Sequence, residues 1–165
     1  MDATFILPIF NESPFINKVI SSILYQNKIN QLDFEILISD GGSTDGTLEI
    51  INSIIQDNSN VHLIDNLQNI VSTGFNFALN KAKGDVIIRV DGHCKIPPDY
   101  LEKCSNLLKS GDADIVGGVI ETISSGLIGN AISVAQSSWF GVGGVKFRNS
   151  NLNKSSYVDT LAFGA

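Results

Sequence analysis

The feature that most restricts the fold of this chain is a regular alternation of short apolar runs with amphipathic helical patterns. Four runs are rich in Ile, Leu and Val and show little polar alternation, as strands do when both faces of their sheet are covered. A strand followed by a helix, repeated four times, predicts a parallel α/β sheet with right-handed crossovers. The predicted strands are Thr4–Phe10, Glu35–Asp40, Val61–Asp65 and Val86–Asp91.

Helical patterns fill the gaps between these runs. The first helix is expected to have Ser13 as its cap and Pro14 at its first position. The second covers Thr47–Gln56, the third carries an apolar stripe from Phe75 to Ala82, and the fourth begins at Asp99.

Beyond the fourth helix the pattern weakens. We expect a fifth strand at Ala113–Val119 and a short helix at Asn130–Ser138. Glycine, asparagine and serine make Phe140–Ser156 a predicted loop, and Tyr157–Leu161 a predicted last strand.

Composition excludes several classes of function. The 165 residues are 43% hydrophobic, enough for the core of one domain, and the net charge of -6 gives no general attraction to nucleic acid. No basic leader opens the chain, and no apolar run approaches the ~20 residues of a membrane span. The two cysteines, Cys94 and Cys104, form no C-x-x-C pair, so we expect a reduced, cytoplasmic protein without a zinc ribbon.

Three of the predicted strands end in segments that carry polar residues. They are Pro8–Glu12, Asp40–Thr47 and Asp91–Cys94. Ligands of open α/β sheets bind outside the carboxyl ends of the strands, so these segments are the candidate site. The glycines after Asp40 lack the Gly-Lys-Ser/Thr of a P-loop, and G-x-G-x-x-G is absent from the chain.

Four of these side chains suggest distinct roles. Asp40 directly follows a buried strand and could accept hydrogen bonds from a base or ribose, whereas Asp45 is interpreted as a turn and cap residue. Asp91 and His93, two residues apart at a strand end, could bind one divalent cation. Mn²⁺ accepts such a mixed ligand set, Mg²⁺ prefers oxygen, and either would stabilise a departing diphosphate.

Together these motifs resemble the inverting glycosyltransferases of family 2, which have the GT-A fold. The motifs are Pro8-Ile-Phe-Asn-Glu12, Asp40-Gly-Gly-Ser-Thr-Asp-Gly-Thr47, Ala82-Lys-Gly-Asp85 and Asp91-Gly-His93. The chain is most similar to the bacterial exopolysaccharide (succinoglycan-type) members. This finer resemblance rests on Arg89-Val-Asp-Gly-His93, Pro97-Pro98, Val116-Gly-Gly118, Val158-Asp159 and Phe163-Gly-Ala165.

The resemblance implies a Rossmann-like three-layer sandwich with a mainly parallel sheet. Residues 1–165 would form one domain, with the nucleotide-sugar-binding part in 1–118 and the start of the acceptor-side part in 119–165. Asp40 would bind the base, commonly uracil, and His93 stands where the family usually has the second Asp of its metal motif. Phe75 stands where the family often has an arginine. The residues implied for the donor nucleotide are Pro8, Phe10, Glu12, Ile38, Asp40, Asp91 and Gly92, and those for Mn²⁺ or Mg²⁺ are Asp91 and His93.

The implied reaction transfers a sugar, with inversion, from a UDP-sugar to a saccharide or lipid-linked acceptor in polysaccharide or cell-envelope biosynthesis. A carboxylate would take the acceptor's proton. That base is expected downstream of Ala165, because Asp159 precedes the expected base motif, so the chain is expected to be a truncated donor-binding product. Membrane association is expected only through segments absent from this chain.

Two other functions remain open at this stage. A nucleotidyltransferase would carry a basic, glycine-rich loop after its first strand, but Asn11–Pro14 has no basic residue. A donor-binding or partner-binding domain without catalysis would fit the expected lack of a base.

Overall fold

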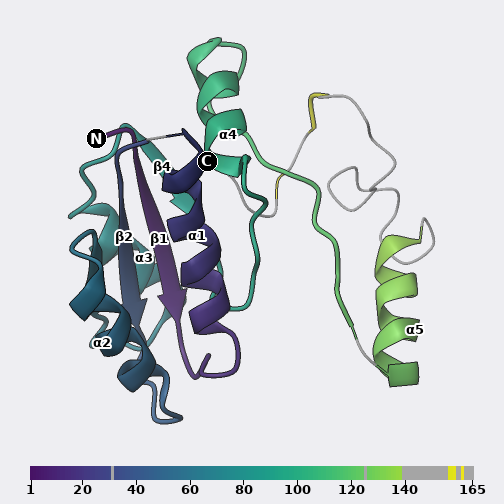
Figure 1. Ribbon diagram of the computed structural model, residues 1–165. Coiled ribbons are helices and arrows are strands. Elements are labelled where there is room, and N and C mark those ends of the chain that lie inside the picture. The colour runs from purple at the N-terminus through teal and green to yellow at the C-terminus, as the bar shows by residue number, and fades with distance from the viewer. Residues whose placement is uncertain (31, 125, 139–155, 159–160, 162–165) are drawn as a thin grey trace. The chain divides into compact units, whose positions relative to one another are not determined.

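The computed structural model describes residues 1–30, 32–124, 126–138, 156–158 and 161 (Figure 1). The chain divides into two compact units, one of residues 1–115 and one within residues 116–164. Each unit is described by itself. Within the described residues, no helix combines the length and the hydropathy needed to cross a membrane.

The first unit is built on a four-stranded sheet in which every strand pair is parallel. The spatial order is β3-β2-β1-β4. The strands are β1 (Ala3–Ile9), β2 (Phe34–Asp40), β3 (Val61–Asp65) and β4 (Val86–Arg89). The predicted parallel sheet is confirmed, although β1 ends one residue and β4 two residues earlier than expected.

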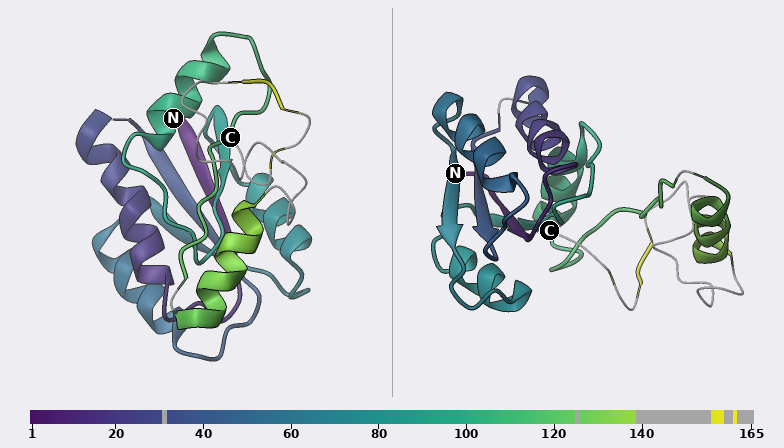
Figure 2. Two further views of the ribbon diagram at one scale, coloured as in Figure 1. Left: turned by 90° about the vertical axis from the view of Figure 1, so that its right-hand side faces the viewer. Right: turned by 90° about the horizontal axis from the view of Figure 1, so that it is seen from below.

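Helices cover both faces of this sheet. On one face lie α1 (Ile16–Asn30), α2 (Thr47–Asp57) and α4 (Tyr100–Lys109), and on the other lies α3 (Val71–Leu79). The right-hand view of Figure 2 shows α1 and α3 on opposite sides of the strands.

Alternate residues of one strand therefore enter two different cores. Phe5 packs with the side chains of α1, whereas its neighbour Ile6 packs with Leu37, Ile64 and Ala78 on the α3 face. Both faces are thus apolar, which explains why the strands appear in the sequence as continuous apolar runs.

The first helix begins later than predicted. Pro14 lies in a turn, in which the backbone oxygen of Glu12 accepts hydrogen bonds from the amides of Phe15 and Ile16, both at 2.9 Å. The helix starts at Ile16. Ser13 contributes its amide to a contact with Asp45 and lies three residues before the helix, so the predicted cap is wrong.

The predicted fifth strand is also wrong. Ala113–Val119 is irregular, and Ile115 and Val119 are 67% and 41% exposed. An apolar run becomes a strand only where another strand offers unpaired backbone groups. No described strand pairs with Ala113–Val119.

The later predictions have mixed outcomes. The short helix is confirmed as α5 (Gly126–Ser137), which starts four residues before the predicted Asn130. Residues 156–158 are not in a strand. Most of the predicted loop and Asp159 of the predicted last strand lie outside the described residues.

The buried carboxylate of Glu35 stabilises the turn that precedes β4. Oε1 of Glu35 accepts hydrogen bonds from the hydroxyl of Thr4, at 2.9 Å, and from the amide of Lys83, at 2.8 Å. The same hydroxyl accepts a hydrogen bond from the amide of Gly84 at 2.9 Å. These contacts bring the start of β4 against β1.

A buried amide side chain anchors the segment between β4 and α4. Nε2 of Gln26 donates to the backbone oxygen of Pro97 at 2.7 Å, and its Oε1 accepts from the amide of Leu101 at 3.1 Å. The residues that follow the Asp91-Gly-His93 triplet are therefore tied to α1.

We expect Gly84→Ala to destabilise the first unit by about 3 kcal/mol, because overpacking a close-packed position has costs of this order. An added Cβ would lie 2.2 Å from the carbonyl carbon of Ala3 and 2.4 Å from the amide nitrogen of Thr4. The matched control is Gly111→Ala, where φ is +77° and no atom lies within 4 Å. That control should cost only about 1 kcal/mol. Denaturant unfolding measures the free energy of unfolding of both variants. Equal losses of stability would contradict the packing explanation.

Candidate functional site

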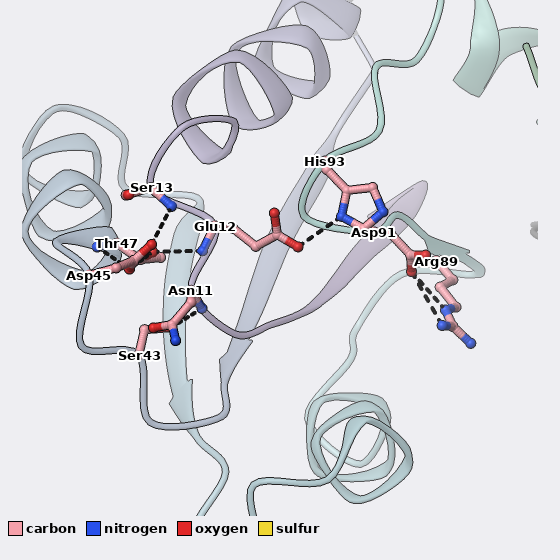
Figure 3. A network of polar contacts seen from close by, with 9 residues as sticks. All are labelled: Asn11, Glu12, Ser13, Ser43, Asp45, Thr47, Arg89, Asp91 and His93. Atoms are coloured by element: carbon pink, nitrogen blue, oxygen red, sulfur yellow. Dashed lines mark hydrogen bonds and ion pairs between the residues drawn. The ribbon is translucent and has the colours of Figure 1, made fainter. Parts of the chain in front are cut away.

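The strand order places a topological switch point between β1 and β4. The chain moves from β1 to β2 and β3 on one side, and then crosses to β4 on the other side. Ligands of open α/β sheets bind at such a point, outside the carboxyl ends of the strands. The loops after β1 and β4 meet here: Nδ1 of His93 lies 2.8 Å from Oε1 of Glu12 (Figure 3).

Asp91 and His93 have different partners. Oδ1 of Asp91 accepts hydrogen bonds from the Arg89 guanidinium, at 3.2 Å from Nη2 and 3.3 Å from Nε. In Figure 3, Glu12 lies on one side of His93 and the Asp91–Arg89 pair on the other. The structure therefore places His93 against a carboxylate that was implied for the donor nucleotide, while the carboxylate of Asp91 is paired with Arg89.

Asp40 stabilises the turn that follows it. Its Oδ2 accepts hydrogen bonds from the amides of Gly42 (2.9 Å) and Ser43 (3.0 Å), and its Oδ1 accepts one from the Ser43 hydroxyl. The residue is 8% exposed. A carboxylate offers about four acceptor positions, and these three bonds of the turn use most of them.

Side chains of the β2–α2 loop bind three consecutive amides of the β1–α1 loop (Figure 3). Asn11 donates its amide to the hydroxyl of Ser43 at 2.8 Å, and Glu12 to that of Thr47 at 2.9 Å. Ser13 donates to Oδ2 of Asp45 at 3.0 Å. In return, Oδ1 of Asn11, whose φ is +54°, accepts a hydrogen bond from the amide of Thr44. The backbone that carries Glu12 is therefore fixed by the neighbouring loop.

Asp45 combines the predicted turn role with one that the sequence did not indicate. Its Oδ1 accepts hydrogen bonds from the amide and hydroxyl of Thr47 at the start of α2, which agrees with the prediction. The Thr47 hydroxyl first, and then the Ser13 amide, lower the pKa of Asp45 to about 2. No local pattern signals the bond to Ser13, because it joins residues 32 positions apart.

The predicted nucleoside-pocket residues differ in their accessibility. Phe10 is exposed, and Glu12 is partly exposed. Pro8 is buried within β1, and Ile38 has no exposed surface because it packs in the core beside α1. The structure therefore does not bring the side chain of Ile38 to the edge of the sheet.

An open hollow of about 620 Å³ lies beside β4 and the start of α3. Asn69 at its rim has a φ of +54°, a conformation that asparagine adopts more readily than most residues. No role was predicted for the segment before α3, which shows in the sequence only as a polar turn between two apolar patterns. The lining residues are Asn69, Ile70, Val71, Ser72, Phe75, Asn76 and Arg89.

The donor atoms here fit a cation that also binds a substrate phosphate. Among the described residues, no three His, Cys, Asp or Glu side chains form a ready-made metal cluster. Asp91 and His93 offer one carboxylate and one imidazole; Mg²⁺ commonly combines one or two carboxylates with phosphate oxygens, whereas an imidazole suits transition metals better. Burial and then the Asp91 carboxylate raise the pKa of Cys94, so its thiol stays protonated and is a poor third ligand.

Comparison with known proteins identifies a family. The family profile described as "Glycosyl transferase family 2" matches residues 4–156. The chain is 32% identical over 145 residues to the "Succinoglycan biosynthesis protein ExoA" of Rhizobium meliloti, covering 87% of this chain and 43% of that protein. It is 30% identical over 118 residues to the "Glycosyltransferase AglE" of Haloferax volcanii, covering 70% of this chain and 38% of that protein. The chain thus spans less than half the length of these relatives.

Solved structures confirm the predicted GT-A fold. TarS 1–349 of S. aureus matches with a TM-score of 0.66 at 22% identity, over 77% of this chain and 38% of that one. The mannosyltransferase PcManGT of Pyrobaculum calidifontis was solved with GDP-Man and Mn²⁺. It matches with a TM-score of 0.59 at 24% identity, over 72% of this chain and 35% of that one.

The stability difference between the wild type and Asp45→Asn should depend on pH. The pKa of Asp45 in the folded protein, about 2, lies below the usual aspartate value of 3.8. The ionised carboxylate therefore stabilises the folded state fully above about pH 4, and this contribution is lost as the pH falls through about 2. Urea unfolding at several pH values should show a difference at pH 6 that shrinks in acid. A difference that does not change with pH would contradict the charge-based explanation.

Proposed function

The chain belongs to glycosyltransferase family 2, and on this premise we propose that it carries the donor site of an inverting, metal-dependent glycosyltransferase. The donor is a nucleotide-diphospho-sugar. Residues 1–118 form the nucleotide-sugar-binding part, and residues 119–165 begin the acceptor-side part.

One observation supports this proposal most directly. Three loops converge on the carboxyl edge of the sheet, and the Asp91–His93 pair lies at the switch point between β1 and β4. Asp40 keeps an acceptor position for a base or ribose, at the end of the neighbouring β2. A diphosphate with a bound cation suits this mixture of acceptors and metal ligands, whereas a P-loop would require a lysine.

Each residue has a part in donor binding. Asp40 accepts a hydrogen bond from the base, Phe10 and Glu12 border the nucleoside, and Asp91 with Gly92 lies beside the ribose and diphosphate. Asp91 and His93 hold Mn²⁺ or Mg²⁺. When bound, the cation neutralises the charge that develops on the departing diphosphate. We assign no catalytic base within residues 1–165.

The names of the relatives support the finer assignments. UDP is the proposed nucleotide, since TarS 1–349, to which the chain is 23% identical, was solved with UDP, although PcManGT was solved with GDP-Man. The acceptor is a saccharide or lipid-linked glycan, as the name "Poly(ribitol-phosphate) beta-glucosyltransferase" and that of the succinoglycan protein suggest. Two free cysteines support a reducing, cytoplasmic location.

Calorimetric titration with UDP, with and without Mn²⁺, tests the metal part of the proposal. We expect Mn²⁺ to strengthen UDP binding, and Asp91→Asn to weaken the Mn²⁺-dependent binding at least about tenfold. The matched control is Asp85→Asn, the same change in an exposed residue at the opposite end of β4. Unchanged Mn²⁺ dependence in Asp91→Asn would remove this residue from the metal site.

A second titration tests Asp40. Asp40→Ala should weaken UDP binding roughly 5- to 150-fold, since a ligand hydrogen bond is typically worth about 1–3 kcal/mol. Because Asp40 also holds its own turn, Ser43→Ala serves as the control: it removes the turn contact to Oδ1, and with it the contact of this hydroxyl to the Asn11 amide, and leaves the carboxylate. Equal losses in both variants would show that Asp40 acts only through the turn.

A further inference from the structure

We propose that Glu12 is a positioning residue that holds the imidazole of His93 with Nδ1 protonated, so that Nε2 is the atom that binds the cation. This inference rests on the proposed function, because it concerns the metal site described there. It adds the identity of the ligand atom and of the carboxylate that orients it.

The contact between the two side chains determines the tautomer. Nδ1 of His93 lies 2.8 Å from Oε1 of Glu12, and an ionised carboxylate can only accept a hydrogen bond. The hydrogen must then be on Nδ1, which leaves the lone pair of a neutral imidazole on Nε2. The His93 side chain is 60% exposed and that of Glu12 only 16%, so the ring is accessible while its partner is largely covered. Metal-binding histidines usually donate their other ring N–H to a carboxylate or carbonyl in this way.

Gly92 provides the space in which Glu12 reaches His93. A Cβ at position 92 would lie 2.7 Å from Cγ and 3.0 Å from Cδ of Glu12. Any larger residue between Asp91 and His93 would therefore displace the Glu12 side chain. This explains a glycine in the middle of the triplet without a positive φ.

The backbone of Glu12 is held on both sides. Its amide donates to the buried hydroxyl of Thr47 at 2.9 Å, and its carbonyl oxygen accepts hydrogen bonds from Phe15 and Ile16. A flexible carboxylate would gain little from an ion pair with an exposed histidine, because solvent weakens the attraction and ordering both side chains costs entropy. With its backbone fixed, Glu12 loses little further freedom when it orients the ring.

Metal binding distinguishes this role from that of an ordinary surface ion pair. Mn²⁺ is titrated into the 165-residue chain in the presence of saturating UDP. Glu12→Gln should raise the dissociation constant for Mn²⁺ about 10- to 100-fold, the range seen when such orienting partners are lost. Gly92→Ala should also raise this dissociation constant, although it replaces neither Glu12 nor His93. The matched control, Glu49→Gln, alters an exposed residue of α2 and should leave the affinity unchanged.

Replacement of the ligand provides a stricter test. A carboxylate at position 93 needs no partner to fix a tautomer. In the His93→Asp background, Glu12→Gln should therefore leave the Mn²⁺ affinity unchanged or raise it, because two neighbouring carboxylates repel each other. An equal loss in both backgrounds would show that Glu12 acts independently of His93, and would overturn the inference.

A spectroscopic readout is independent of the metal. The ¹⁵N shifts of the His93 ring in the metal-free protein, measured above the usual titration range of imidazole, should report the Nδ1-protonated tautomer in the wild type. Glu12→Gln should shift the population toward the Nε2-protonated form. An Nε2-protonated ring in the wild type would overturn the inference.

The two proposals fail in different ways. If the wild type shows no Mn²⁺-dependent UDP binding, both are wrong. If the wild type binds Mn²⁺ with UDP and Glu12→Gln binds it equally well, only the role of Glu12 is wrong.

Discussion

The rest of the first unit depends on the position of β1 between two parallel partners. Pairing with β2 in register from Ala3↔Phe34 to Ile9↔Asp40 brings the carboxyl ends of β1 and β2 to the same edge. Pairing with β4 on the other side creates the switch point. Thr4 and Glu35 also bind the turn before β4, so hydrogen bonds at the opposite end of the strands fix where β4 begins.

The functional edge is stiffened by side chains that satisfy backbone amides. A loop that contains Pro14 and a left-handed Asn11 cannot satisfy its own N–H groups as a helix or strand would. The next loop provides hydroxyl and carboxylate acceptors for three of them. Asp45 and Thr47 thereby serve two structures, the start of α2 and the support of Glu12. The proposed donor site is therefore built on a rigid scaffold although its residues lie in loops.

The strands and the candidate site residues were predictable where a local sequence pattern specifies them. The four strands were predicted from apolar runs, and the candidate site from the polar residues that end three of them. The predicted strand at Ala113–Val119 failed because strand formation needs a partner, which composition does not reveal. Ser13 was assigned as a cap because its local sequence resembles one, yet its amide binds a residue of the following loop. Ile38 was assigned to the pocket, but the packing of α1 covers it.

The sequence by itself determined the parallel α/β class and the family, and it indicated the edge at which we propose the site. These follow from periodicity and from motifs whose residues are neighbours along the chain. Only the tertiary structure decided which side chain meets which at that edge. The contact between Glu12 and His93 joins residues 81 positions apart, and it depends on strand order, on the turn before Ile16 and on the space left by Gly92. Local sequence cannot specify such a contact, because it forms only when two separate loops are brought together by the pairing of β1 with β4.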